Sequence, residues 1–369
     1  MNLWKNAVAV ASAANPGARM VLKGHIHFSR WVDSGLTPPV RVMSTREWDS
    51  FGSVGSDVID NYSPRTGPMA EVILLEGEPA RVLFRSHHAL MDGRGAVTWA
   101  GDVFRALRGE PVVDSEDRIT ENTLLNISPK RPNATAGCGF IAPTGAAAGD
   151  ARGFLWGRRV VTGRFSSLLP RIMILTAREA WRHGEGRVRF SIPVDLRPRR
   201  PGLKSSGNLT NAINLEVTPQ STVDSIAAEI ADRLKQRRDG YLSIGERMIS
   251  FLPLCLMERL ILRLARQGFR TGEYLYSGII SNQGLFDIEA FQGGGFAART
   301  VYATPACLET VPFSLCITGM RDEVNLLAAM PRPLASGGRM EELLSRIARG
   351  LAEDNGAGSE KGDRTVRCA

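Results

Sequence analysis

The segment 69–107 constrains the fold of this 369-residue chain more than any other part of its sequence. Apolar runs at 69–75 and 80–86 flank a turn that contains Gly and Pro, and they predict an antiparallel pair of strands. Apolar residues then recur at helical spacing over 95–107. The residues 87–93, His-His-Ala-Leu-Met-Asp-Gly, lie between the second strand and this helix. We therefore expect them to form a loop that is held rigidly at both ends.

This loop places two of the five histidines of the chain beside an acid and a glycine. Histidine gains and loses a proton near neutral pH, so a histidine fixed at a strand end can act as a general base. A structural role is the alternative for each histidine. Adjacent strand residues point to opposite faces, so we do not expect His87 and His88 to share one metal ion. The sequence holds no second Cys/His cluster at zinc spacing, and we predict no metal site.

The motif resembles that of the condensation-domain superfamily. This group includes condensation domains of nonribosomal peptide synthetases, stand-alone acyltransferases and chloramphenicol acetyltransferase. Further segments resemble family segments in the same order: Arg-Thr-Gly-Pro at 65–68, Ile-Pro-Val-Asp-Leu-Arg at 192–197, Gly-Asn-Leu-Thr-Asn-Ala-Ile-Asn at 207–214 and Ser-Asn-Gln-Gly at 281–284. Together they span most of residues 15–350.

Two departures from the family pattern qualify this resemblance. Only 86 residues precede His87, fewer than in other members, which implies either a gene start further upstream or a missing edge element. The Asp-Phe-Gly-Trp-Gly segment of plant-type and acetyltransferase members is absent, because residues 287–291 read Asp-Ile-Glu-Ala-Phe. The second departure favours the condensation or stand-alone bacterial branch.

The fold expected from the alternation of strands and helices is α/β or α+β. The resemblance implies two chloramphenicol-acetyltransferase-like lobes that form a V-shaped pseudo-dimer with an active-site tunnel between them. We place the N-terminal lobe at 1–127, a linker rich in Pro, Gly and Ala at 128–153, the C-terminal lobe at 154–353 and a disordered tail at 354–369.

Further elements follow from periodicity and turn residues. We expect helices at 166–182, at about 222–234 after a Ser or Thr cap, at 244–266 with a break at Pro253, and at 339–351. We expect strands at 19–31, with His25 and His27 on one face, and at 187–194, 211–217, 276–281, 299–302, 313–318 and 324–330.

The resemblance implies a role for each residue of the motif. His88 would take the proton of the acceptor, and Gly93 would supply a backbone N–H close to the reacting centre. Asp92 would pair with Arg197 and pin the loop, while His87 would contribute mainly to stability. Ser281 and Asn282 would line the tunnel, with capping of a strand end as the alternative.

The implied reaction moves an acyl group from a thioester to an amine or hydroxyl acceptor. The donor would be a carrier-protein phosphopantetheine arm or coenzyme A, and no cofactor would be bound permanently. One alternative is epimerisation of a carrier-bound aminoacyl thioester, with a second-lobe glutamate as partner base. The candidate glutamates are Glu216, Glu273 and Glu309. The other alternative is a non-catalytic protein that recruits partners.

Charge and composition narrow the partners. The net charge of +8 suits anionic partners such as carrier proteins or the phosphates of coenzyme A. No basic stripe is interleaved with aromatic residues, so we predict no nucleic-acid partner. No apolar run of about eighteen residues exists, so we predict no membrane partner. The alanine-rich segment 7–14 fits a helix of the fold better than a signal peptide. Five scattered cysteines fit reduced thiols, and we expect a cytoplasmic monomer.

Overall fold

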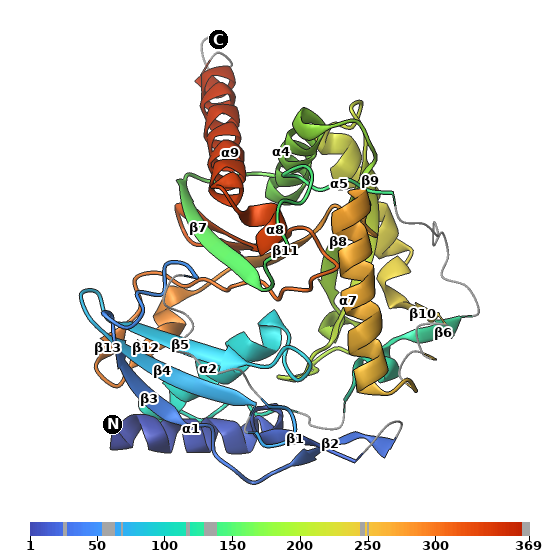
Figure 1. Cartoon of the computed structure of the whole chain (residues 1–369). Coiled ribbons are helices and arrows are strands. Elements are labelled where there is room, and N and C mark those ends of the chain that lie inside the picture. Colours follow the sequence, from blue (N-terminus) through green and yellow to red (C-terminus); the bar gives the residue numbers. More distant parts are fainter. Residues whose placement is uncertain are drawn as a thin grey trace.

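The computed structural model describes residues 1–24, 28–53, 63–67, 69–115, 119–128, 139–243, 248 and 251–363, and the side chains of 126–128, 242–243 and 354–363 are outside this description. Two lobes lie one above the other in Figure 1, with the N-terminus in the lower one and the C-terminal helix in the upper one. The mixed α/β fold in two lobes agrees with the prediction.

The first lobe is built on the three-stranded sheet β3-β4-β5. Its strands are β3 (Val40–Ser44), β4 (Ala70–Glu76) and β5 (Arg81–Ser86). β3 runs parallel to β4, and β4 runs antiparallel to β5. Two helices that pack on each other, α1 (Asn2–Ala14) and α2 (Gly93–Leu107), complete the lobe. The predicted strand pair and the helix after the motif are confirmed, and the sequence pattern missed β3.

Aromatic side chains fill the space between the helices and the sheet. Trp99 and Phe104 of α2 are buried, and each contacts the ring of Phe84 on β5. Trp4 of α1 meets Phe104 edge to face, with 5.7 Å between ring centroids. A buried amide, Asn15 Nδ2, donates to Asp102 of α2 at 2.8 Å. The N-terminal helix is therefore part of the core, as the sequence predicted for residues 7–14.

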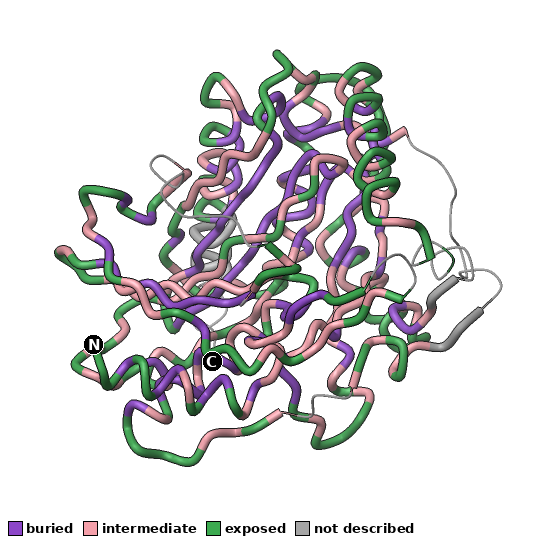
Figure 2. Tube along the Cα trace, turned by 60° about the horizontal axis from the view of Figure 1, so that its bottom comes forward, coloured by how far each residue is buried: buried purple, intermediate pink, exposed green. Residues whose placement is uncertain are grey.

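The second lobe contains a six-stranded sheet in the order β7-β15-β14-β11-β8-β9. The strands are β7 (Phe154–Thr162), β8 (Val188–Asp195), β9 (Thr210–Val217), β11 (Gly278–Leu285), β14 (Ser314–Gly319) and β15 (Glu323–Pro331). β8, β11 and β14 run parallel to one another. Buried residues are most frequent on β8, β14 and β15 of this sheet. In Figure 2 the buried segments lie in the interior of the molecule.

Three helices share the hydrophobic core of this sheet: α4 (Leu168–His183), α5 (Val223–Lys235) and α9 (Arg339–Asp363). They lie on the side of the sheet away from the first lobe (Figure 1). Thr222 caps α5 and Ser225 completes the capping box, so the predicted cap is confirmed. The lobe also carries α8 (Arg332–Ala335) and α7 (Leu254–Thr271). α7 begins directly after Pro253, where a break in the helix 244–266 was expected, and it ends five residues later than expected. Residues 244–247 and 249–250 of the expected helix lie outside the described residues.

Smaller elements connect these parts. They are η1 (Pro16–Arg19), the hairpin β1 (Met20–Lys23) and β2 (Arg30–Asp33), α3 (Glu121–Leu124), β6 (Asn126–Ser128), η4 (Arg197–Arg199), η5 (Arg238–Gly240), β10 (Tyr241–Ser243), η6 (Ile288–Phe291), β12 (Gln292–Gly293) and β13 (Phe296–Ala297).

Three expectations differ from the structure. The expected strand 19–31 is wrong, because β1 ends at Lys23 and β2 pairs back with it; His25 and His27 lie outside the described residues. Residues 299–302 form no strand. The backbone of α9 continues as helix to Asp363, although we expected disorder from residue 354. The stretch 364–369 lies outside the described residues.

The chain passes between the lobes more than once. Phe291 of η6 is buried in the core of the first lobe, 5.8 Å from the ring of Phe104. In the predicted linker, Phe140 is fully buried and its backbone pairs with Tyr274 of the second lobe. β6, near the end of the predicted first lobe, pairs in parallel with β10. The boundaries at 127, 153 and 353 remain predictions, and packing crosses them.

Candidate functional site

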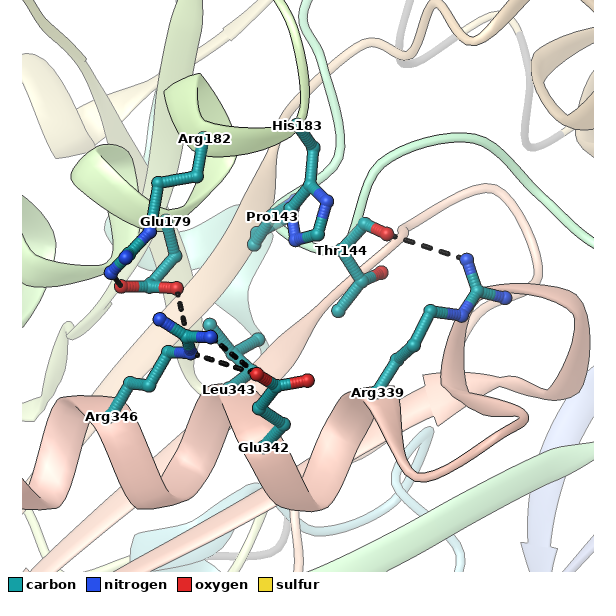
Figure 3. Close-up of a pocket in the computed structure, with 9 residues that line it drawn as sticks. All are labelled: Pro143, Thr144, Glu179, Arg182, His183, Arg339, Glu342, Leu343 and Arg346. Carbon is teal, nitrogen blue, oxygen red and sulfur yellow. Dashed lines mark hydrogen bonds and ion pairs between the residues drawn. The ribbon is translucent and has the colours of Figure 1, made fainter.

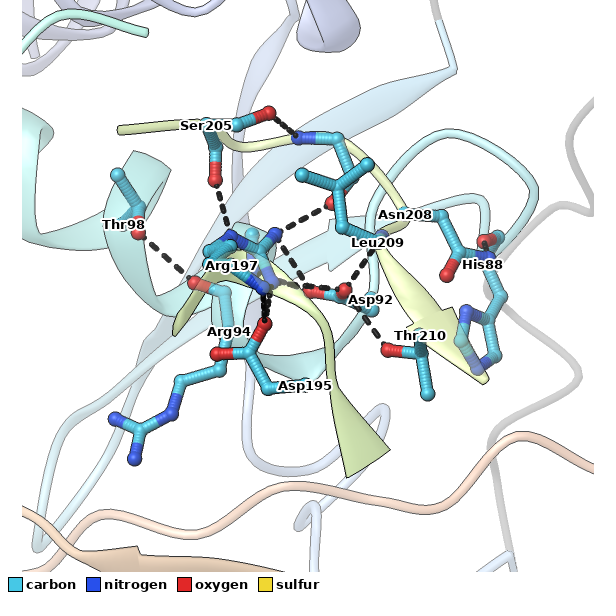
Figure 4. Close-up of polar contacts among 12 residues, drawn as sticks. His88, Asp92, Arg94, Thr98, Asp195, Arg197, Ser205, Asn208, Leu209 and Thr210 are labelled. Carbon is cyan, nitrogen blue, oxygen red and sulfur yellow. Dashed lines mark hydrogen bonds and ion pairs between the residues drawn. The ribbon is translucent and has the colours of Figure 1, made fainter. Parts of the chain in front are cut away.

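The carboxylate of Asp92 is the central acceptor of the motif loop. Asp92 caps α2, and its Oδ1 accepts the N–H of Gly95 at 2.7 Å. Its Oδ2 accepts the backbone N–H of Leu209 at 2.8 Å and the hydroxyl of Thr210 at 2.9 Å. The residue is 4% exposed. Since Thr210 is the first residue of β9 and Leu209 directly precedes it, this carboxylate joins the first lobe to the second (Figure 4).

Arg197 completes this joint. Its Nη1 and Nη2 each donate to one oxygen of Asp92 at 3.0 Å, in the bidentate geometry that suits a guanidinium and a carboxylate. It also donates to Asp195 and to the carbonyls of Ser205 and Gly207. Burial acts to lower the pKa of Arg197, but its contacts with the two carboxylates raise that pKa above the ordinary value.

Gly95 has a packing role that the sequence analysis missed. A Cβ on Gly95 would lie 2.1 Å from the carbonyl oxygen of Ser206, which is far inside van der Waals contact. The backbone of the second lobe around 205–207 therefore rests directly on the first turn of α2. Two glycines within the first three residues of a helix are an unfavourable composition, and this was the signal for a close backbone approach.

His87 is turned into the loop. Its ring Nδ1 accepts the backbone N–H of Ala89 at 3.1 Å, and its backbone N–H donates to the carbonyl of Met69 at 2.9 Å. Burial, followed by the neighbouring His88, lowers the pKa of His87 below 6.5. The imidazole is therefore neutral at pH 7 and holds the loop backbone.

His88 is presented differently. The residue is exposed, and no hydrogen bond of its imidazole is recorded within the described part of the chain. Its carbonyl accepts Nδ2 of Asn208 at 2.8 Å, so the backbone is fixed from the second lobe while the ring is left available (Figure 4). An anchored backbone with an available imidazole fits a group that exchanges protons with a bound molecule.

The end of β11 meets the motif at Gly93. The carboxamide of Gln283 lies against it, since a Cβ on Gly93 would be 2.6 Å from Oε1. Gln283 Nε2 donates to the hydroxyl of Ser281 at 2.7 Å. Asn282 is exposed, and its Oδ1 accepts the N–H of Gly284 at 2.9 Å. Ser281 therefore approaches the motif through Gln283, which the sequence analysis missed, while Asn282 supports the local turn.

The three glutamates considered as partner bases are not gathered at the motif. Glu216 lies six residues beyond Thr210 on β9, about 20 Å along the strand. It pairs with Arg187 and Arg189; burial acts to raise the pKa of Glu216, but these contacts lower it below the ordinary value. Glu273 precedes β11 and Glu309 precedes β14, so both lie near the N-terminal ends of these two parallel strands. The motif contacts the opposite, C-terminal end of β11 through Gln283.

Cysteine chemistry has little support among the described residues. Burial raises the pKa of Cys307 to about 12 and that of Cys316 to about 12, so neither thiol ionises near neutral pH. Cys255 is exposed on α7. Cys138 and Cys368 lie outside the described residues. The described residues also contain no group of three or more metal-ligating side chains.

A cavity of about 200 Å³ lies far from the motif, between the end of α4 and the start of α9 (Figure 3). Charges within its wall neutralise one another, because Arg346 pairs with Glu342 and Glu179, and Arg182 pairs with Glu179. Arg339 donates to the carbonyls of Thr144 and Ala146. We assign this cavity a structural role, and the site of interest remains the motif loop.

No family model and no curated protein matches this sequence. Solved structures do match. A variant of the starter condensation domain of rhizomide synthetase RzmA, in complex with C8-CoA and Leu-SNAC, has a TM-score of 0.59 at 16% identity, over 96% of this chain and 86% of that one. The epimerization domain of the third module of tyrocidine synthetase B has a TM-score of 0.54 at 12% identity, over 95% and 90%. The chain therefore has the two-lobed fold of these domains, as the motif predicted.

Proposed function

We propose that this protein transfers an acyl group from a thioester to an amine or hydroxyl acceptor, with His88 as the general base. One observation carries the proposal. The motif loop is fixed by Asp92 and by the bond from Asn208, while the imidazole of His88 remains exposed and available. The described residues suggest no competing nucleophile.

In the proposed reaction, His88 takes the proton of the acceptor as its nitrogen or oxygen attacks the thioester carbonyl. The carbonyl oxygen gains negative charge, and the C–S bond then breaks. The thiolate leaves and receives the proton from His88, so the enzyme returns to its starting state. The N–H groups of Gly93 and Arg94 open α2 and have no partner within the helix, so they are suited to stabilise the charged oxygen.

The proposal that the donor is an acyl thioester rests on the similarity of fold alone. One protein with this fold was crystallised with C8-CoA and an aminoacyl thioester analogue, Leu-SNAC. We propose the same class here, carried by coenzyme A or by the phosphopantetheine arm of a carrier protein. The net charge of +8 suits either anionic donor. Epimerisation has less support, because the three candidate glutamates lie away from the motif. A purely recruiting role would have no use for an available His88.

The test is thiol release from octanoyl-CoA and from an octanoyl carrier protein, with panels of amines and alcohols and with mass spectrometry of the products. We expect acceptor-dependent product. His88→Ala should lower the rate by about 10²–10⁴-fold, the usual contribution of a positioned base, without changing the fold. His183→Ala is the matched control, because His183 is an exposed histidine at the end of α4.

Two outcomes would contradict the proposal. One is an unchanged rate in well-folded His88→Ala. The other is turnover that inverts an aminoacyl thioester without acceptor, which would assign epimerisation instead.

A further inference from the structure

The helix α7 packs on little of the molecule. Of its 18 residues, Ala265 and Gly268 are the buried ones. The helix contacts the rest of the lobe near its C-terminal end. There Gly268 packs against the ring of Tyr274, and the ring centroids of Phe269 and Tyr274 are 6.5 Å apart. In Figure 1, α7 stands at one side of the second lobe, apart from α4 and α9. Helices in proteins are stabilised mainly by packing of an apolar face, so the exposed apolar surface of α7 requires an explanation.

A leucine stripe runs along the exposed part of this helix. Leu256, Leu260 and Leu264 are spaced four residues apart and are 48%, 43% and 46% exposed. Two further apolar residues near the N-terminal end of α7 are also exposed: Phe251, ahead of the helix, is 52% exposed, and Leu254, its first residue, is 58% exposed. An apolar surface of this kind usually marks a site of interaction with another molecule or a membrane.

A row of arginines lies beside the leucine stripe. Arg259, Arg263, Arg266 and Arg270 follow at spacings of four, three and four residues, so they share one face of α7. All four are exposed, and none takes part in an ion pair recorded within the described ranges. The helix contains one acid, Glu258. The exposed surface of α7 therefore carries an apolar stripe beside a cationic row.

We propose that α7 binds the surface of an anionic lipid bilayer, with the leucine stripe in the interfacial region and the arginine row on lipid phosphates. A helix with a leucine face and a basic face lies in the plane of such an interface. Guanidinium groups pair strongly with phosphate oxygens. A second copy of the chain would fit less well, because mutual packing of two leucine stripes would bring two arginine rows together.

A lipid surface also explains the apolar residues outside the helix. Phe251 and Leu252 lie in the irregular chain ahead of Pro253, and both are exposed. A bilayer accommodates such side chains without a complementary groove. The sequence predicted no membrane partner because no apolar run is long enough to cross a bilayer, and no helix of the described part could do so. An interfacial helix needs no such run, and the proposal is independent of acyl transfer.

The test is flotation of the full chain with vesicles made of equal parts phosphatidylglycerol and phosphatidylcholine, and with pure phosphatidylcholine vesicles. We expect binding to the mixed vesicles only, and weaker binding as salt rises. Each arginine at the surface contributes about fivefold in affinity, so Arg259→Gln with Arg263→Gln should lower binding by about 25-fold. Replacing Leu256, Leu260 and Leu264 by Ser should abolish flotation. Leu234→Ser is the control, because Leu234 is an exposed leucine on α5.

Every residue changed is exposed, so the variants should keep the parent circular dichroism spectrum and melting temperature. Equal flotation of the parent and the leucine variant would overturn the proposal. So would a concentration-dependent dimer in sedimentation that the leucine variant loses, since a second copy would then cover α7. Binding of an acidic carrier protein through the same residues, without any affinity for vesicles, would likewise replace the lipid with a protein partner.

Discussion

Removal of the Asp92 carboxylate tests the joint between the lobes most directly. This carboxylate accepts five hydrogen bonds, two of them from Arg197, and it is 4% exposed. Asp92→Ala leaves Arg197, with a side chain that is 11% exposed, without its main counter-charge. A buried pair that loses one partner costs about 3–5 kcal/mol of unfolding free energy. The cap of α2 is lost at the same time, which alone is worth about 1 kcal/mol. We therefore expect a loss in the upper part of that range.

The assay is urea unfolding followed by tryptophan fluorescence and by circular dichroism. Asp195→Ala is the matched control, because Asp195 contacts the same guanidinium at 2.8 Å but its side chain is 31% exposed. That pair should contribute about 1 kcal/mol or less. Arg197→Met combined with Asp92→Ala should recover part of the loss, because the buried charge is then absent. A loss below about 1 kcal/mol for Asp92→Ala, equal to the control, would refute the argument that this pair joins the lobes.

Two further predictions follow from the same loop. Gly95→Ala should destabilise the protein by about 1–3 kcal/mol in urea unfolding, because the new Cβ would meet the carbonyl of Ser206 at 2.1 Å. Gly101→Ala on the same helix should be neutral or stabilising, since nothing lies within 4 Å there; equal effects would contradict the packing argument. Because the pKa of His87 is lower in the folded protein than in the unfolded chain, the unfolded chain protonates this imidazole more readily. The free energy of unfolding should therefore fall as pH drops through about 6.5. His87→Gln should reduce this slope in melting temperatures measured from about pH 7.5 to about 5.5, and an unchanged slope would remove His87 as its cause.

Local patterns predicted the elements around the motif because each pattern lies within one segment. The strand pair follows from two apolar runs around a turn, and α2 follows from the helical spacing of its apolar residues. Thr222 caps α5 by accepting the N–H of Ser225, which is only three residues away. The pairing of Asp92 with Arg197, 105 positions apart, came from the resemblance to a family and from no spacing rule. The resemblance brought the segment 281–284 to the tunnel through Ser281 and Asn282, but nothing in the sequence singled out Gln283 as the residue that contacts Gly93, because that contact depends on how β11 meets the first lobe.

The failures have physical causes of the same kind. Residues 299–302 have a composition suited to a strand, but their backbone joins no sheet. The ring of Tyr302 instead packs under the guanidinium of Arg158, whose Cζ lies 4.3 Å from the ring centroid. β7 was missed because Gly157 and two arginines interrupt its apolar pattern. Gly157 nevertheless suits the strand, since a Cβ there would lie 3.2 Å from Met340 of α9. In both cases a contact with a distant segment decides the local structure.

The motif divides into residues that hold the lobes together and a residue that is free to act. Asp92 and Gly95 contact the second lobe directly, and His87 bonds the loop to itself. None of these three contacts needs a substrate. His88 alone among the motif side chains is exposed with a fixed backbone and an available ring. If His88 is the general base, as we propose, a chain could keep His87, Asp92 and Gly95 for stability and lose the chemistry by changing His88. Under that proposal, the contacts of Asp92 and Gly95 mark the joint between the lobes, and the second histidine is the residue whose replacement should separate stability from activity.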